Sequence, residues 1–518
     1  MLFLAPPTVF SYLCFAKIGC GSDKAWENKF SPAFPLTFRY LWLRPRLRRL
    51  GNAKENELFL GAALAFRYLC YANKRSTPPR RRGPRTGGAS PHRTTTMRAL
   101  LLNTSEQTGG AAIAAHRIMQ ALNKNGVQAR MLVRDATGTD EHVVRLAPSP
   151  ALRAKFVMER AAIWAGNGFS RRHLFEIDPA THGSDVTPYD VFRRADVVHL
   201  HWVNQAFLSM EGLRRIFGSG KPLVWTLHDM WPFTGVCHYA RECDGWLWGC
   251  GRCRLLARPR GNDLSRRTFV AKQRLFAHAR VHIVACSRWL ADLARRSPVL
   301  EGQPVWSIPN PIDTDFFSPS SRETARRRLG LPVEKRLLLF AAYQVADPLK
   351  GVTYLAEAVE RLVAARPDLR DRLGIIVAGR GAEDWRNRFA VPAYPQGYVQ
   401  GAAAMRELYR AADVLAMPSM ADNLPNTIVE AMACGVPCAG FDVGGLPQLI
   451  GHGTDGYLAR LRDADDLARG IEATLLSPAL DALRRAAREK ALHSYSETAV
   501  ARQYARVYEQ AIEETSNR

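Results

Sequence analysis

The chain has 518 residues, of which 47% are hydrophobic and 9% aromatic, and its 72 Lys and Arg outnumber its 48 Asp and Glu for a formal charge of +24. This composition supplies ample core, so it excludes a chain that is disordered throughout, and the length suits roughly two to four domains of about 150 residues. Ten cysteines are too few for a disulfide scaffold, and no apolar run reaches the roughly 18 residues of a membrane span.

Residues 1–96 differ in composition from the rest, because they hold 17 Lys and Arg but only 4 Asp and Glu. Pro78–Arg85 is a basic, Pro-rich stretch that does not fit a packed sheet. The first residues are apolar but have no positively charged start and contain a Pro pair, so they make a poor secretory signal. We expect Met97 to be the natural start and residues 1–96 to be a basic extension that is disordered or not native. A basic tail that touches anionic lipid or nucleic acid is the alternative.

From Met97 onward the pattern alternates strand and helix. Ala99–Leu102 is a continuous apolar run, apolar residues recur at helical spacing from Ala114 to Leu122, and residues 127–133 alternate as a strand. These three segments predict a β-α-β unit. Four further apolar segments are typical of parallel strands that are buried on both faces: Asp196–Trp202, Leu223–His228, His282–Ser287 and Val305–Ile308.

A second alternating series begins after the charged connector Ser318–Arg328. Its predicted strands are Leu337–Ala341, Gly374–Ala378, Val414–Met417 and Cys438–Phe441, and its predicted helices are Val352–Ala365, Ala402–Ala411 and Thr427–Cys434. The predicted fold class is therefore α/β, with two Rossmann-like, doubly wound domains at 97–315 and 316–490 and a C-terminal helix within 491–518. The carboxyl ends of both sets of strands should face one cleft, where ligands bind in such sheets.

Two loops that follow a first strand could bind an anion. Gly109 and Gly110 would let the backbone approach a ligand at a helix N-terminus, although a tight turn is the alternative. Lys350 follows the first strand of the second half and could neutralise phosphate, although a solvated loop lysine is the alternative. The chain has no G-x-G-x-x-G at the first strand, which argues against a dinucleotide-dependent oxidoreductase.

The segment Asp422–Pro437 combines a loop with the start of a helix and carries two acids. Asp422 and Glu430 lie eight residues apart, Asn426 could cap the helix, and Glu430 is an acid on an otherwise apolar helix. A buried acid needs a partner, and sugar or ribose hydroxyls suit a carboxylate that accepts up to about four hydrogen bonds. A structural cap followed by a glutamate on the helix surface is the alternative.

Four cysteines, Cys237, Cys243, Cys250 and Cys253, form a C-x5-C-x6-C-x2-C pattern. Thiols this close together suit a structural zinc, which would pin the loop after His228, although only the last two have the usual spacing. Unliganded or redox-active thiols are the alternative.

These motifs resemble, in their order, those of family 4 glycosyltransferases of GT-B fold, over about residues 97–518. The resemblance rests on Asp422–Pro437, Ser307–Phe316, Ala285–Trp289, Lys350–Gly351, Ala378–Gly381 and Ala412–Ser419. Within that family, Leu227–Gly235 and the following Cys237–Tyr239 resemble the branch that builds bacterial exopolysaccharide of the colanic-acid kind.

The resemblance implies a retaining transferase that needs no cofactor for catalysis. A nucleotide-diphosphate sugar (NDP-sugar) would bind the second domain as donor, and a saccharide acceptor, joined to a lipid, would bind the first. In the family, the counterpart of Glu430 holds the donor ribose and that of Asp422 contacts sugar hydroxyls. Lys350 matches a phosphate-binding lysine, and His228 matches a histidine that points at the donor sugar.

The sequence departs from the family pattern at two places. Pro425 stands where many members have Gly, so Asn423, Leu424 and Asn426 would have to supply the remaining donor contacts. The arginine that commonly accompanies the phosphate-binding lysine has no evident counterpart, and Arg380 is the one candidate replacement.

We expect a cytoplasmic protein that binds no nucleic acid and contacts anionic lipid at the inner membrane face through arginines of the first domain. These are Arg171, Arg172, Arg193, Arg194, Arg214, Arg215, Arg252, Arg254, Arg258 and Arg260, and ordinary surface arginine is the alternative. Among other functions, a sugar-nucleotide epimerase would need no acceptor, and a phosphorylase would need a pyridoxal-phosphate lysine for which no motif is present. A nucleic-acid-binding protein would explain the sequence pI near 10, but the chain lacks a reader motif.

Overall fold

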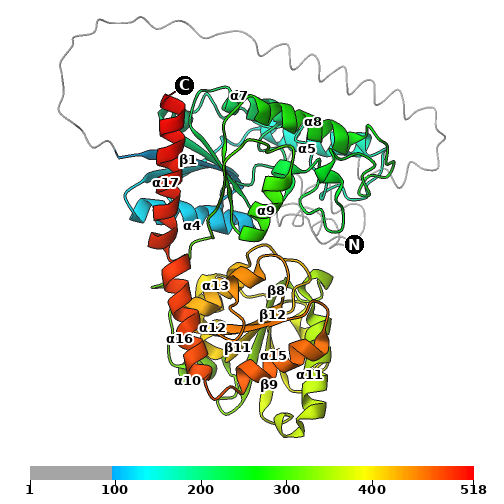
Figure 1. Cartoon of the computed structure of the whole chain (residues 1–518), viewed down its shortest axis with the longest axis vertical. Helices are drawn as coiled ribbons and strands as arrows, with labels where there is room; N and C mark the ends of the chain where they lie inside the picture. The colour runs from blue at the N-terminus through cyan, green and yellow to red at the C-terminus, as the bar shows by residue number, and fades with distance from the viewer. Residues whose placement is uncertain (1–95, 518) are drawn as a thin grey trace, which may run out of the picture. The chain divides into compact units, whose positions relative to one another are not determined.

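Two parallel β-sheets, one after the other along the chain, organise residues 96–517, the part of the protein that the computed structural model describes (Figure 1). The expectations for residues 1–95 lie outside the described residues. The first sheet has seven strands in the order β3-β2-β1-β4-β5-β6-β7, and the second has six in the order β10-β9-β8-β11-β12-β13. Neighbouring strands pair in parallel throughout both sheets, so the predicted α/β fold class is confirmed.

The first sheet is built from short strands that helices connect. Its strands are β1 (Arg98–Ser105), β2 (Gln128–Asp135), β3 (Val143–Arg145), β4 (Val197–Leu200), β5 (Leu223–Leu227), β6 (His282–Ala285) and β7 (Val305–Ser307). Its helices are α4 (Gly110–Lys124), α5 (Pro150–Gly166), α6 (Asp190–Arg194), α7 (Met210–Phe217), α8 (Leu264–Ala277) and α9 (Arg288–Arg296).

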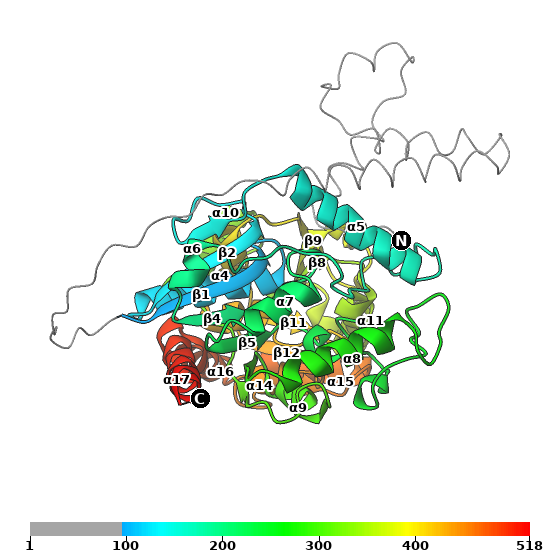
Figure 2. The same ribbon diagram turned by 90° about the horizontal axis from the view of Figure 1, so that it is seen from above.

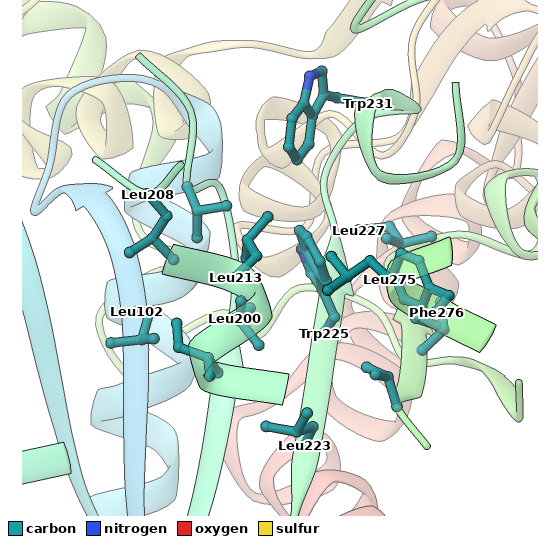
Figure 3. Close-up of a cluster of buried hydrophobic side chains, with 14 of the residues drawn as sticks. Leu102, Leu200, Leu208, Leu213, Leu223, Trp225, Leu227, Trp231, Leu275 and Phe276 are labelled. Atoms are coloured by element: carbon teal, nitrogen blue, oxygen red, sulfur yellow. The ribbon is translucent and has the colours of Figure 1, made fainter. Parts of the chain in front are cut away.

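Alternate residues of β1 enter two different cores, because successive side chains of a strand point to opposite faces of the sheet. Leu100 and Leu102 share a core with Trp225 of β5 and Phe276 of α8, and Figure 3 shows the indole of Trp225 surrounded by leucines of this cluster. Leu101, between them, packs on the other face against α4. Seen from above, α7 lies over β4 and β5 (Figure 2). Because both faces are covered, these strands are continuous apolar runs in the sequence.

The second sheet repeats this construction. Its strands are β8 (Arg336–Gln344), β9 (Leu373–Arg380), β10 (Ala393–Gly397), β11 (Val414–Met417), β12 (Cys438–Phe441) and β13 (Gly456–Ala459). Its helices are α10 (Arg322–Leu329), α11 (Val352–Ala365), α12 (Ala402–Ala411), α13 (Asn426–Ala433), α14 (Leu446–Leu449), α15 (Ala464–Leu475) and α16 (Leu480–Lys490). Helices α11 and α15 cover one face, and α12 and α13 cover the other. No helix among residues 96–517 has both the length and the apolar character to cross a membrane.

The last helix, α17 (Glu497–Ser516), returns to the first sheet. The side chain of Ser496 caps it by accepting a hydrogen bond from the amide of Ala499. Tyr504 and Tyr508 are buried in the same core as Leu101, so the end of the chain completes the core of the first sheet. We call the first sheet with its helices and α17 the first half of the molecule, and the second sheet with its helices the second half.

Candidate functional site

The loop after β11 brings Asp422 beside Lys350. The lysine ends a short 3-10 helix, Pro348–Lys350, that follows β8, and β8 pairs with β11 in the sheet. The Lys350 Nζ atom lies 2.7 Å from Oδ2 of Asp422. Because parallel strands end at a common edge, this pair lies where open α/β sheets bind their ligands. The lysine supplies positive charge for a phosphate, and the aspartate supplies acceptor oxygens for hydroxyl groups.

Glu430, on α13, is a buried acid whose two oxygens both have partners. Only 8% of the residue is exposed. Its Oε1 atom accepts a hydrogen bond from the Arg117 guanidinium of α4 at 2.6 Å, and its Oε2 atom accepts one from the Tyr409 hydroxyl of α12 at 2.7 Å. The alternative of a glutamate on the helix surface is therefore wrong. The sequence analysis predicted neither Arg117 nor Tyr409 as a partner of Glu430.

The side chain of Asn423 joins the second half of the chain to the first. Its Oδ1 atom accepts a hydrogen bond from the Ser287 hydroxyl at 2.5 Å, and its Nδ2 group donates to the His228 carbonyl at 3.1 Å and to the Cys286 sulfur at 2.9 Å. Leu424, the next residue, is buried in the core of the second sheet. The Asn423 side chain is thus occupied by the protein itself, and the Leu424 side chain is held in the core.

Asn426 does not cap α13 as the sequence predicted. Pro425 occupies the N-cap position and no side chain caps the helix, so Asn426 is already the first helical residue. Its Oδ1 atom accepts a hydrogen bond from the Asn310 amide at 3.1 Å. The prediction failed because proline, whose missing amide proton suits a helix start, moved the boundary by one residue.

His228 follows the end of β5 and is paired with a second histidine. Its Nε2 atom lies 3.0 Å from Nδ1 of His201, which follows β4, and the two rings stack. Burial lowers the pKa of His228 to about 4, so the imidazole is neutral near pH 7. The structure therefore places a neutral histidine, with its ring orientation fixed, beside the Asp422 loop. The sequence offered one signal for His201, a second histidine at a neighbouring strand end.

Asp229 fixes the loop after His228. Its Oδ2 atom accepts hydrogen bonds from the Trp202 indole at 2.9 Å and from His238 Nδ1 at 2.7 Å, and its Oδ1 atom accepts one from the Trp231 amide. Burial opposes a charge on His238, but the Asp229 carboxylate outweighs burial and raises the pKa of His238. Tyr239, the next residue, is half-exposed. Partial burial raises the pKa of Tyr239, and so do the carboxylates of Asp229 and Asp422, so its hydroxyl stays protonated.

Gly109 and Gly110 lie at the start of α4. Gly109 adopts a φ of +93°, a region that L side chains avoid, and this alone requires glycine there. A Cβ atom added at either position would meet nothing within 4 Å, so the backbone at this helix start is open. Arg117, the partner of Glu430, lies seven residues further along α4 and hence on the same face as Gly110.

Close backbone contact holds the Asp422 loop in place. Gly444 and Gly445, between β12 and α14, pack so tightly on it that a Cβ atom at Gly445 would lie 1.6 Å from the Asn423 carbonyl oxygen. The Gly445 amide donates to the Asp422 carbonyl at 3.1 Å. Only glycine permits this approach, which orients Asp422 and Asn423 together.

Zinc binding by the four cysteines after His228 stays a prediction. Cys237, Cys243, Cys250 and Cys253 are unpaired and half-buried. Within the described residues no group of three or more His, Cys, Asp or Glu side chains is placed to hold a metal ion. Burial raises the pKa of Cys237 to about 11 and that of Cys250 to about 12, so these thiols are protonated when no metal is bound.

A buried lysine holds this loop. The Lys272 ammonium, from α8, donates to the carbonyls of Trp231, Thr234 and Gly235, and its Nζ atom lies 3.6 Å from the centroid of the Trp231 ring. The lysine thereby satisfies the carbonyl groups that converge after His228.

Arg380, at the end of β9, belongs to a cluster of aromatic side chains. Its guanidinium carbon lies 4.8 Å from the ring centroid of Tyr343 and 5.1 Å from that of Tyr398. Among the described residues its guanidinium contacts these rings and forms no ion pair with a carboxylate. The lysine is therefore the cation that the structure pairs with Asp422.

Two family models match the chain, one to each sheet. The model described as Glycosyltransferase Family 4 matches residues 108–316, which include α4 and the strands β2 to β7. The model described as Glycosyl transferases group 1 matches residues 334–477, which include all six strands of the second sheet.

Curated relatives share part of their length with this chain. The D-inositol 3-phosphate glycosyltransferase of Geodermatophilus obscurus is 36% identical over 186 residues, which are 32% of this chain and 39% of that protein. The protein of the same name from an Arthrobacter species is 27% identical over 391 residues, which are 72% of this chain and 84% of that protein. The chain thus spans less than half the length of the first of these relatives.

Solved structures show the same arrangement of two domains. Sucrose-phosphate synthase from Thermosynechococcus elongatus has a TM-score of 0.56 at 20% identity, covering 81% of this chain and 100% of that one. Anabaena Alr3699/HepE in complex with UDP-glucose has a TM-score of 0.52 at 17% identity, covering 80% and 100%. At such identities the likeness establishes the fold, and it confirms the predicted GT-B architecture.

Proposed function

We propose that this chain, a family 4 glycosyltransferase of GT-B fold, moves a sugar from a nucleoside-diphosphate donor to a saccharide acceptor with retention of anomeric configuration. The two family matches and the fold support the transferase assignment. One observation carries the proposed site: the Asp422 loop is bound on one side to Lys350 and on the other, through Asn423, to the carbonyl of His228. Groups from both halves of the chain therefore meet at this loop.

The donor would lie at the second half. Glycosyl transfer passes through an oxocarbenium-like transition state, and here the leaving group is a diphosphate, so stabilising the leaving charge should supply much of the rate. Lys350 provides that positive charge, and the backbone at Asp422–Leu424 faces the donor. Asp422 is already paired with the lysine, so we assign it to sugar hydroxyls and to the orientation of Lys350 rather than to nucleophilic attack.

His228 would act without a charge. Because the pKa of His228 is lowered to about 4, its ring is neutral. Its Nε2 atom is bound to His201, and its other ring nitrogen can form a hydrogen bond with a sugar hydroxyl. This arrangement suits a group that positions the donor sugar, and it does not provide the acid–base pair of a hydrolase.

The acceptor would lie at the first half, near Gly109 and Gly110. We propose a lipid-linked saccharide in exopolysaccharide or cell-surface glycan synthesis, handled by a protein that touches the inner membrane face peripherally. The names of the relatives make a phosphorylated polyol the second acceptor class. The UDP-glucose complex of a structural neighbour makes UDP the first nucleotide to test.

Nucleotide binding tests the donor site. Calorimetric titration of the full chain with UDP, GDP and ADP should show selective binding of one nucleotide. Lys350→Ala should weaken that binding by about tenfold or more, because a charge-assisted contact to phosphate is lost. Lys335→Ala is the matched control and should bind as wild type does. Lys335 precedes β8 and is remote from Asp422 in the sheet. A folded chain that binds none of the three nucleotides would refute the proposed donor site.

A radiolabelled transfer assay separates the transferase from an epimerase. With the nucleotide-sugar of the preferred base, sugar should move only when an acceptor is present. Conversion of the nucleotide-sugar to an isomer without any acceptor would favour the epimerase instead.

A further inference from the structure

Glu430 of the second half is held by an arginine from the first half. The Arg117 guanidinium lies 2.6 Å from Oε1, and the side chains of Arg117 and Glu430 are 16% and 11% exposed. The Arg117 guanidinium also lies over the Phe317 ring, with its carbon 5.6 Å from the centroid, which limits its movement. The contact joins α4 to α13, between residues 313 positions apart in the chain.

Tyr409 holds the other oxygen of the same carboxylate. Burial, and then the neighbouring Glu430, raise the pKa of Tyr409, so its hydroxyl remains protonated and donates to Oε2. A carboxylate accepts up to about four hydrogen bonds, two on each oxygen. Arg117 and Tyr409 use one position on each oxygen, which leaves one acceptor position on each.

This pattern matches the two neighbouring hydroxyls of a ribose. A vicinal diol presents two O–H donors side by side, and a carboxylate whose oxygens are each half-satisfied can accept one hydrogen bond from each hydroxyl. A carboxylate that could rotate would lose this match, because a bidentate contact requires both oxygens to face the diol.

We propose that Arg117 is a positioning residue, which fixes the Glu430 carboxylate so that it binds the 2′- and 3′-hydroxyls of a ribonucleotide donor. The proposal rests on the proposed function and adds to it a role for the first half of the chain in donor recognition, exerted through Glu430. Arg117 acts through Glu430 and touches no reacting atom. Loss of the arginine should therefore weaken donor binding and leave the chemical step unchanged.

The test measures binding and turnover separately in the full chain. The probes are UDP, GDP and ADP, and then the 2′-deoxy form of whichever nucleotide binds tightest. Arg117→Gln should weaken binding of the ribonucleotide by about tenfold or more, raise the donor KM in the same proportion and leave kcat within about twofold. Wild type should discriminate against the 2′-deoxy nucleotide, and Arg117→Gln should lose that discrimination. Arg117→Lys keeps a cation and should recover part of the affinity.

Two further variants separate positioning from structure. In a double-mutant cycle with Glu430→Gln, the Arg117→Gln change should have no additional effect on affinity if the arginine acts only through Glu430. Arg130→Ala, at an exposed arginine of β2, is the matched control and should behave as wild type. Thermal unfolding of every variant shows whether it is folded at the assay temperature.

The outcomes distinguish failure of the Arg117 proposal from failure of the proposed function on which it rests. If wild type binds a nucleotide and Arg117→Gln binds it equally well with unchanged discrimination, the positioning role is refuted and the donor site stands. Additive losses in the double-mutant cycle would likewise refute action through Glu430. If folded wild type binds no nucleotide, both proposals fail.

Discussion

Two buried histidines, His199 and His201, and the half-buried His228 follow one another near the strand ends of the first sheet. His199, on β4, bonds the Tyr508 and Thr226 hydroxyls at 2.7 Å each, its ring centroid lies 4.0 Å from that of His201, and His201 in turn contacts His228. Burial lowers the pKa of all three rings, and their mutual proximity lowers it further for His199 and His201. The stack is therefore neutral at physiological pH, and protonating it would place charge in an apolar interior.

The stack predicts loss of stability in mild acid. Between pH 6.5 and about 4, these histidines bind protons in the unfolded chain but remain neutral in the folded protein. The free energy of unfolding must therefore fall as the pH falls. For His228 alone, a shift from 6.5 to about 4 amounts to about 2 kcal/mol at pH 5. Thermal unfolding at pH 6.5 and pH 5 should show a lower Tm at pH 5, and His228→Gln should reduce that difference.

His238 acts in the opposite direction in this measurement. Its pKa is raised above the usual 6.5, so its stabilising contribution is still incomplete at pH 6.5, becomes complete by pH 5 and opposes the fall in Tm. Buried carboxylates such as Asp229 have lowered pKa values and lose their contribution only in stronger acid. Equal Tm values at pH 6.5 and pH 5 would show that the histidine stack is not buried in solution.

At the level of single residues, the sequence analysis identified charged residues of the candidate site but not the residues that bind them. The sequence singles out Lys350, Asp422 and Glu430, because a charged residue among apolar ones is unfavourable unless it has a partner. Arg117 and Tyr409 lie on helices where arginine and tyrosine are ordinary, and only folding brings them to Glu430. The roles of these residues in donor binding remain predictions until the nucleotide titrations are made.

Among the elements, helix α17 does most to define the first half. Tyr504 and Tyr508 are fully buried against the first sheet, and their hydroxyls hold Thr226 and His199. A helix that follows the second sheet in sequence thus completes the core of the first. The molecule cannot be cut after α16 without exposing that core.

A large-to-small change in α17 should destabilise the first core. Tyr508→Ala removes a buried ring and leaves the His199 Nδ1 atom without its partner, so the free energy of unfolding should fall by about 3–5 kcal/mol. Urea unfolding followed by tryptophan fluorescence measures this, because Trp225 reports on the same sheet. Arg506→Ala, at an exposed position of α17, should cost little and is the control. A similar loss in both variants would contradict the assigned packing.

The strands that the sequence missed are short and lie at an edge of a sheet. β3, β10 and β13 are each three to five residues long, and each is the last strand at one edge of its sheet. An edge strand is covered less than a central one, so it needs no continuous apolar run and gives a weak signal. The central strands, which are buried on both faces, were all readable.

Over the whole molecule, exposed aromatic and basic side chains gather on two loops of the first half. Trp248 is 79% exposed and Phe169 is 65% exposed. The two loops are joined, since the Ala257 amide donates to Asn167 Oδ1 at 2.7 Å. The exposed arginines of these loops are Arg171, Arg172, Arg252, Arg254, Arg258 and Arg260. Aromatic side chains beside arginines suit the interface of an anionic bilayer, which supports the proposed peripheral contact.

Vesicle flotation tests this contact. The chain should float with vesicles that contain phosphatidylglycerol and remain unbound with phosphatidylcholine alone, and added salt should weaken the binding. The double change Phe169→Ser and Trp248→Ser should reduce flotation, whereas Leu461→Ser, at an exposed leucine of the second half, should not. Equal binding to both kinds of vesicle, or none to either, would contradict the assignment.

The sequence by itself determined the α/β class, the two Rossmann-like repeats and the residues that carry charge into apolar surroundings. It could do so because strand and helix periodicity, and the cost of burying an unpaired charge, are local properties of the chain. Only the tertiary structure decided that Glu430 meets Arg117 and Tyr409, that Lys272 binds the carbonyl groups of the loop after His228, and that α17 completes the first core. Those contacts join residues far apart in sequence, and their energies depend on distances that exist only after the chain has folded.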